Sequence, residues 1–276
     1  MQKGRLRKIW KWTRIIAIIY VILGIAIYFL QEKVVFQSVK LPADHVFHFP
    51  QPFREVNVAI NNEKNLSVIQ FTVADFVRKG LVLYFHGNRD NIERYARFAS
   101  NFTNNNYEVW MIDYPGYGKT TGERSEQIIY DDALQFYKLA RARFSRDSII
   151  IYGRSLGTGN ATQLASVRDC KRLILEAPYY SMDAMFRHYL FIYPFSWIVK
   201  YHFPTYQYLE KVNAPVTIFH GTADQVVPFK QSKWLMEVRN ENRFFTKQLI
   251  PIEGAKHNSV SDFPEFHQKL DSILQH

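Results

Sequence analysis

The residues best suited to chemistry are a serine and two glycines in the pattern G-x-S-x-G at residues 153–157. The pattern is typical of a sharp turn between a strand and a helix, which lifts the serine hydroxyl above the edge of a sheet. A β-branched run at 148–152 predicts the strand. We therefore expect Ser155 to be a nucleophile, with Gly153 and Gly157 as the small residues that so tight a turn requires.

A serine is a weak nucleophile unless a neighbouring base takes its proton, and histidine is the usual base. On a sheet that carries such a turn, the chain order is serine, acid, histidine, each after a strand. Of nine histidines, His257 alone lies between the last predicted strand, 244–252, and the last predicted helix, 263–274. We expect His257 to be the base, and His86 and His220 to be structural residues.

The acid of such a site holds the imidazole in one tautomer and stabilises its cation. Asp224 follows the predicted strand 216–220 and precedes a helix that is expected to begin near Pro228. The alternative is Glu176, at the end of the predicted strand 172–176. The sequence favours Asp224 as the acid and Glu176 as a structural residue near the turn.

A negative oxygen that develops during attack on a carbonyl needs two N–H donors. One is expected from Leu156, the residue after the nucleophile, and the other from the loop 85–91. The position of that loop favours Asn88 as the oxyanion-hole donor. Asp90 and Asp113 are interpreted as residues that support the loop.

The elements that must position these residues alternate between strands and helices from residue 55 onward. Such alternation predicts a mainly parallel sheet with helices on both faces, opened by an antiparallel pair with a turn at 61–62. Strands are expected at 55–60, 65–73, 81–85, 107–114, 148–152, 172–176, 216–220 and 244–252, and helices at 91–105, 126–144, 157–167, 234–240 and 263–274.

One stretch, residues 179–208, breaks this alternation. It holds 12 aromatic residues in 30 positions, whereas aromatic residues make up 16% of the chain. Because it falls between two predicted strands, we interpret it as an inserted aromatic lid. A segment this short has little interior for so many rings, so some are expected to line a substrate pocket. Phe191 and Trp197 are the candidates for contact with substrate.

The N-terminus carries an uncharged stretch at residues 15–30. It spans about 24 Å as a helix, and about 31 Å if it begins at residue 10, against a hydrocarbon core of about 30 Å. The alternative, a cleaved signal peptide, needs a small-x-small site, and bulky residues stand there instead. We therefore expect a transmembrane anchor at 15–30, or at 10–30 in the longer version. A basic tail at 1–14 precedes it and a linker at 31–54 follows it.

The distribution of charge predicts how the anchor is oriented and whether the domain binds nucleic acid. No acid precedes residue 32, and the six cations before the anchor are Lys3, Arg5, Arg7, Lys8, Lys11 and Arg14. They predict a cytoplasmic N-terminus, with domain 55–276 outside the cytoplasm and, in a bacterium, facing the periplasm from the inner membrane. The remaining residues carry 29 basic and 25 acidic side chains without a basic run. Nucleic acid is therefore not expected as a partner.

The chain has a single cysteine, Cys170, expected to be a small thiol at the edge of the core. One cysteine excludes an intrachain disulfide and a zinc site built from several cysteines. No segment matches a metal, nucleotide or flavin motif, so we expect no metal and no cofactor. The oligomeric state is not predicted by any feature of the sequence.

Taken in chain order over residues 55–275, the motifs resemble the α/β-hydrolase superfamily. More narrowly, they resemble its single-domain, N-terminally anchored members, which are related to eukaryotic protein depalmitoylases and lysophospholipase-like hydrolases. The matching motifs are His86-Gly87-Asn88, Asp113-Tyr114-Pro115-Gly116-Tyr117-Gly118, Gly153-Arg154-Ser155-Leu156-Gly157, His220-Gly221-x-x-Asp224-x-Val226-Val227-Pro228 and Gly254-x-x-His257. The resemblance implies an α/β-hydrolase fold, but not one substrate, because the superfamily includes esterases, thioesterases, lipases and peptidases.

These observations predict a membrane-anchored serine hydrolase that cleaves a carboxylic ester or thioester through an acyl-enzyme. The expected substrate is a small acylated or lipid-like molecule near the bilayer. One alternative is a serine peptidase acting on short peptides, which an acidic lid pocket would favour. Asp183 is the one acid within 179–208. The alternative from a different class is a pseudo-hydrolase that binds a partner through its lid without catalysis.

Overall fold

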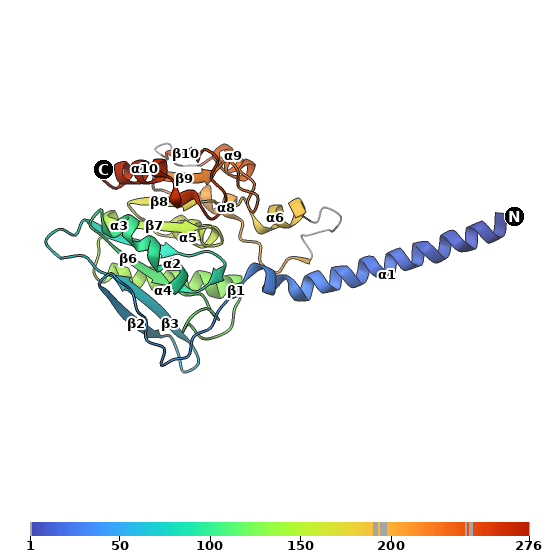
Figure 1. Ribbon diagram of the computed structural model, residues 1–276, viewed down its shortest axis with the longest axis horizontal. Coiled ribbons are helices and arrows are strands. Elements are labelled where there is room, and N and C mark those ends of the chain that lie inside the picture. The colour runs from blue at the N-terminus through green and yellow to red at the C-terminus, as the bar shows by residue number, and fades with distance from the viewer. Residues whose placement is uncertain (1, 190–192, 194–197, 241, 243–244, 276) are drawn as a thin grey trace.

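The computed structural model describes residues 2–189, 193, 198–240, 242 and 245–275. Its body is an eight-stranded, mainly parallel sheet with helices on both faces, and one long helix projects away from that body (Figure 1). The expected fold, an α/β sheet domain preceded by one apolar helix, is confirmed.

The large sheet has the strand order β10-β9-β8-β7-β4-β6-β3-β2. The first two strands along the chain, β2 and β3, pair antiparallel, as does β3 with β6, and the other neighbours are parallel. The strands are β2 Phe53–Ala59, β3 Asn65–Phe71, β4 Gly80–Phe85, β6 Tyr107–Ile112, β7 Ile149–Arg154, β8 Arg172–Glu176, β9 Val216–Gly221 and β10 Lys247–Ile252.

Helices cover both faces of this sheet (Figure 1). They are α2 Ile92–Tyr95, η1 Ala96–Ala99, α3 Ser100–Thr103, α4 Glu126–Arg141, η2 Arg146–Ser148, α5 Gly157–Val167, α6 Met182–Tyr189, α8 Thr205–Leu209, α9 Lys230–Glu237, η3 Val260–Asp262 and α10 Pro264–Gln275. The prediction of one continuous helix at 91–105 was wrong, because the chain tightens into 3-10 geometry at η1. Tyr95 and Phe98, three residues apart, are both buried there, which suits a period of three residues.

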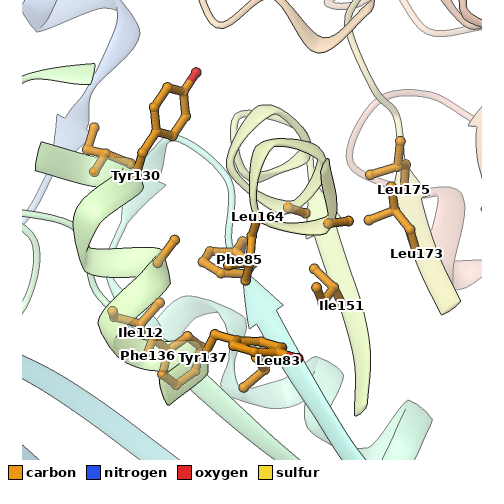
Figure 2. Close-up of a cluster of buried hydrophobic side chains, with 14 of the residues drawn as sticks. Leu83, Phe85, Ile112, Tyr130, Phe136, Tyr137, Ile151, Leu164, Leu173 and Leu175 are labelled. Carbon is orange, nitrogen blue, oxygen red and sulfur yellow. The ribbon is translucent and has the colours of Figure 1, made fainter. Parts of the chain in front are cut away.

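Alternation along the strands divides the core between the two faces of the sheet. In β7, Ile151 packs on one side, whereas Ile150 and Tyr152 pack on the other, because successive strand residues point to opposite faces. Figure 2 shows the first of these two clusters, in which strand residues meet Phe136 of α4 and Leu164 of α5. Burial of each such side chain contributes about 1.5–3 kcal/mol, so the strand ends that carry the site are firmly held.

Residues 179–208 lie between β8 and β9 and contain α6 and α8, with Phe191 and Trp197 outside the described residues. Many of the described rings in this stretch belong to the core of the domain. Tyr201 and Phe203 are 3% and 0% exposed, and Tyr201 packs against Phe36 with ring centroids 4.7 Å apart. The aromatic density therefore serves the packing of the domain as well as the walls of a pocket.

The N-terminal helix α1 extends over Gln2–Val35, well beyond the predicted span. Its stretch Gly4–Val35 is long and apolar enough to cross a membrane, and no second such helix occurs in the described chain. The expected linker at 31–54 has ordered structure at its start. It begins as the last turn of α1 and continues into β1, Gln37–Ser38, which pairs in parallel with β5, Arg89–Asp90.

Three contacts between the end of α1 and the body explain this docking. Gln31 is 2% exposed; its Nε2 donates to the Ile198 carbonyl at 2.9 Å, and its Oε1 accepts from the Lys200 N–H at 2.8 Å. Nearer the middle of α1, Tyr193 stacks on Tyr20 with ring centroids 4.5 Å apart. The end of the helix is thus fixed to the segment between β8 and β9.

Candidate active site

Ser155 occupies a strained turn between β7 and α5. Its φ of +51° lies in the left-handed region, which a residue with a Cβ rarely adopts. A Cβ on Gly153 would come within 2.6 Å of the Gly157 carbonyl oxygen, and one on Gly157 within 2.1 Å of the Phe85 carbonyl oxygen. Both positions therefore require glycine, as the G-x-S-x-G pattern predicts.

The structure brings the three residues of the predicted triad together. The Oγ of Ser155 lies 2.9 Å from Nε2 of His257, in the loop after β10. Nδ1 of the same ring lies 2.7 Å from Oδ2 of Asp224, in the loop after β9. Because a carboxylate only accepts hydrogen bonds, this pair places the ring proton on Nδ1 and leaves Nε2 free to accept from the serine hydroxyl.

Besides His257, Asp224 accepts hydrogen bonds from three further donors that sequence analysis did not identify in full. Its Oδ1 accepts from the N–H groups of Val226 and Val227, both at 2.8 Å. His220 donates from Nε2 to Oδ2 at 3.2 Å, and its Nδ1 lies 2.6 Å from the Ser232 hydroxyl. Burial alone raises the pKa of Asp224, but the hydrogen bonds from His220 and His257 outweigh it and hold the pKa well below its usual range.

Glu176, the alternative acid, has different partners. Its side chain accepts a hydrogen bond from Tyr152 and forms an ion pair with Arg154 at 3.4 Å, and its backbone carbonyl accepts from the Ser155 N–H at 2.9 Å. Arg154 in turn donates to the carbonyl of Asn258, next to His257, at 3.2 Å. Glu176 therefore supports the turn and the histidine loop without touching the imidazole. The variable second position of G-x-S-x-G offered no signal for this role of Arg154.

The two expected oxyanion donors both line the cavity beside Ser155. Within the described chain, the N–H groups of Asn88 and Leu156 donate to no protein atom. The Asn88 carbonyl accepts from the Gln37 N–H at 2.9 Å and from the Tyr117 hydroxyl at 2.7 Å. The segment that follows α1 therefore holds the loop that presents one donor.

His86 and Asp113 support the loop 85–91, which carries Asn88. His86 is fully buried; its Nδ1 lies 2.7 Å from the Gly87 carbonyl and its Nε2 lies 3.2 Å from Oδ1 of Asp113. Burial raises the pKa of Asp113 despite its hydrogen bond to His86. Asp90 supports the loop through its backbone, which has a φ of 65°. Its carbonyl accepts a hydrogen bond from the Val39 N–H at 3.1 Å.

The cavity at Ser155 has a volume of about 310 Å³. Its walls come from separate segments of different chemistry. The apolar part includes Val34 and Val35 of α1, Met182, Met185 and Phe186 of α6, and Val226 and Val227 beside Asp224. The segment after β4 contributes Arg89, Arg94, Tyr95, Arg97 and Phe98. In the part of the chain that the structure describes, no cluster of three His, Cys, Asp or Glu residues is arranged to hold a metal ion.

Comparison with known sequences finds one family model and a group of curated relatives. The family model described as serine aminopeptidase, S33, matches residues 77–211, which include Ser155 and end before Asp224. Alpha/beta hydrolase domain-containing protein 17C of Xenopus tropicalis is 30% identical over 199 residues, covering 71% of this chain and 61% of that protein. The human protein of that name is 29% identical, covering 71% and 58%. The chain thus spans about three fifths of the length of these curated relatives.

Solved structures share the fold at low sequence identity. An esterase from Pyrococcus furiosus superposes with a TM-score of 0.64 at 18% identity, covering 87% of this chain and 97% of the other. A monoacylglycerol lipase from Paleococcus ferrophilus has a TM-score of 0.57 at 17% identity, covering 76% and 98%. At these identities, the two structures support the fold, and substrate has to be argued from this chain's own cavity.

Proposed function

We propose that this chain, a member of the α/β-hydrolase superfamily, is an esterase- or lipase-like serine hydrolase that cleaves acyl esters or thioesters beside a membrane. The observation that carries this proposal is the hydrogen-bonded series Ser155–His257–Asp224 at a largely apolar cavity. In this proposal, Ser155 is the nucleophile, His257 the base and Asp224 the residue that orients the base.

The proposed reaction follows from the geometry. His257 Nε2 takes the hydroxyl proton as Ser155 Oγ attacks the acyl carbon, and Asp224 stabilises the imidazolium. The N–H groups of Asn88 and Leu156 hold the oxygen that becomes negative. His257 then donates its proton to the leaving oxygen or sulfur, and the acyl group stays on Ser155. A water that gives its proton to His257 attacks the acyl-enzyme, and the proton returns to Ser155 as the acid departs.

The apolar wall of the cavity supports an acyl chain as the recognised group. Each methylene removed from water contributes about 0.8 kcal/mol, so four methylenes raise the specificity constant by about two orders of magnitude if all are buried. Phe186 and Met185 of α6 are placed to contact such a chain. We expect kcat/KM on p-nitrophenyl esters to rise from acetyl to at least hexanoyl.

The anchor is the second part of the proposal. Residues 15–30 span the bilayer inside α1, the basic residues before them remain in the cytoplasm, and domain 55–276 lies outside it. Tyr193 contacts Tyr20, which lies 11 residues before Gln31, about 16 Å along the helix. This contact supports a lid that lies against the bilayer, where an acyl chain is already present.

Topology has a direct test. Asn62, in the exposed turn between β2 and β3, is replaced by cysteine in a Cys170→Ser background. An impermeant maleimide should label Asn62→Cys on intact cells or spheroplasts. Labelling that occurs only after lysis would place the domain in the cytoplasm and refute the proposed orientation.

The peptidase alternative is disfavoured by the charge of the cavity. A peptide amino terminus is a cation, and a site that binds it needs an acid nearby. Among the described residues that line the cavity, four are arginines and none is acidic. Amino-acid amides are therefore expected to be poor substrates.

The decisive experiment compares the wild-type chain with Ser155→Ala in neutral detergent. The assay uses p-nitrophenyl esters of increasing chain length, a matched thioester series, amino-acid amides and a fluorophosphonate probe. Ser155→Ala should lose probe labelling and almost all turnover. Phe186→Ala should flatten the dependence on chain length. Wild-type activity that is highest on acetyl esters, or confined to amides, would overturn the acyl-chain assignment, and turnover by Ser155→Ala at the wild-type rate would overturn the nucleophile.

A further inference from the structure

Three arginines at the cavity have no counter-ion in the described chain. Arg89, Arg94 and Arg97 are exposed, and none of them forms an ion pair with a described residue. The fourth arginine of the cavity, Arg154, differs because it is 5% exposed and paired with Glu176. The cavity therefore carries three guanidinium groups that are not paired with any described carboxylate.

The acids of the same segment form no ion pair with these arginines. Glu93 is paired with His45 at 2.9 Å, and Asp90 belongs to β5; neither lines the cavity. A bound anion would supply the counter-charge that the described ion pairs do not give to these guanidinium groups.

The geometry of the segment suits one kind of anion. Arg94 and Arg97 are three residues apart, so their side chains leave the chain on the same side. The Arg97 guanidinium lies 4.6 Å from the centroid of the Phe98 ring, a cation–π contact that limits its orientation. Planar guanidinium groups bind phosphate oxygens in pairs, through two parallel hydrogen bonds.

The position of these arginines relates the anion to the proposed substrate. Arg89 follows Asn88, the proposed oxyanion donor, and all three arginines line the same cavity as Ser155. A substrate whose acyl carbon lies at Ser155 can place its chain along Met185 and Phe186 and its alcohol part near the arginines. The cavity thus matches an amphiphile with one apolar arm and one anionic arm.

We propose that Arg89, Arg94 and Arg97 bind the phosphate of the substrate's alcohol part, so that the preferred substrate is an acyl ester of a phosphorylated glycerol, as in a lysophospholipid. This inference rests on the proposed acyl-ester hydrolysis and adds a headgroup site to it. The end of the anchor contributes Val34 and Val35 to the same cavity. The arginines consequently lie at the level of the membrane surface, where anionic lipid headgroups concentrate around basic side chains.

The test uses two esters that differ only in the phosphate, 1-hexanoylglycerol and 1-hexanoylglycerol 3-phosphate. Both dissolve as monomers, so a difference in rate reports on the cavity and not on attraction to a charged surface. The full chain in neutral detergent should show kcat/KM about tenfold higher for the phosphorylated ester, a difference of about 1.4 kcal/mol. That ratio should fall toward one as salt concentration rises.

The double variant Arg94→Gln with Arg97→Gln should bring the ratio close to one. The matched control is Arg54→Gln with Arg168→Gln, which removes two exposed guanidinium groups that do not line the cavity. The control should keep the wild-type ratio, and thermal midpoints of both variants show whether each is folded. A wild-type ratio near one, or an unchanged ratio in the cavity variant, would overturn the headgroup site.

Competition by inorganic phosphate shows whether the arginines bind the phosphate of the substrate or a free inorganic anion. In this proposal, inorganic phosphate competes with the phosphorylated ester and raises KM for that ester more than for the neutral one. Equal inhibition of both esters would instead assign the arginines to a free inorganic anion and overturn the headgroup site. If wild-type enzyme hydrolyses neither hexanoyl ester nor any p-nitrophenyl ester, the proposed function itself fails.

Discussion

Replacement of Asp224 by asparagine tests the triad at its most constrained residue. The two carboxylate oxygens accept four hydrogen bonds: Oδ2 from His257 at 2.7 Å and His220 at 3.2 Å, and Oδ1 from Val226 and Val227 at 2.8 Å. An amide has one acceptor oxygen and one NH2 donor. Whichever way the amide is turned, its NH2 group therefore faces two donors.

The expected loss of activity depends on which pair of donors the amide oxygen faces. The two backbone N–H groups cannot change their protonation, so the amide oxygen is expected to face Val226 and Val227. The NH2 then faces His257, whose Nδ1 must accept, and the ring proton moves to Nε2. In that tautomer His257 cannot take the proton of Ser155. The equivalent change in a well-studied serine protease lowers kcat by roughly four orders of magnitude, and we expect a loss of about 10³–10⁴ here.

The assay is kcat/KM for p-nitrophenyl hexanoate, normalised to the folded fraction from circular dichroism. Glu176→Gln is the matched control, because it makes the same chemical change in the alternative acid. It leaves Arg154 without its partner and should lower the thermal midpoint, yet change kcat/KM of the folded enzyme by less than about tenfold. The reasoning is refuted if Asp224→Asn retains activity within tenfold of wild type, or if Glu176→Gln loses more activity than Asp224→Asn.

Three further outcomes can be measured on the same protein. Gln31→Ala removes two part-buried hydrogen bonds to backbone groups at 198–200, each contributing about 0.5–1.5 kcal/mol, so it should destabilise the docked end of α1 by about 1–3 kcal/mol. This is seen as a lower thermal midpoint in detergent, whereas an unchanged midpoint contradicts the docking. Gly157→Ala places a Cβ 2.1 Å from the carbonyl oxygen of Phe85 and should cost at least about 1–3 kcal/mol together with most activity; wild-type behaviour would show that the turn relaxes at little cost. Because the pKa of Asp224 is depressed by folding, its stabilisation is complete above about pH 5 and is lost as the pH falls below about 4. The thermal-midpoint advantage of wild type over Asp224→Asn should accordingly shrink on acidification, and an advantage that grows would contradict the sign of the shift.

Local patterns were sufficient for much of the fold and for the order of the triad. The apolar runs that end at Phe85 and Tyr152 are strands because their alternate residues pack on both faces of one sheet. The two glycines around Ser155 are readable in sequence because their requirement is local. In each case the interacting residues are close in the chain, or repeat with the period of one element.

Other features depended on residues that are far apart in the chain. Nothing around Gln31 indicates that it bonds to residues 198–200, or that Val34 reaches the cavity. The roles of Arg154, and of the arginines at 89–97, arise in the same way from the packing of distant loops. For this reason, the contacts that the start of the expected linker at 31–54 makes with the body could not be predicted from its own sequence.

The sequence by itself therefore determined which residue types are available for chemistry, the strands that carry them and the apolar helix before them. Those properties follow from side-chain size, charge and periodicity, which act over a few residues. Only the tertiary structure decided that Asp224, and not Glu176, meets His257. It also decided that the end of α1 shares a cavity with Ser155 and with three arginines that form no ion pair in the described chain. Hydrogen bonds and ion pairs act over a few ångströms, and residues separated by many positions come within that range only once the sheet has brought its strand ends together.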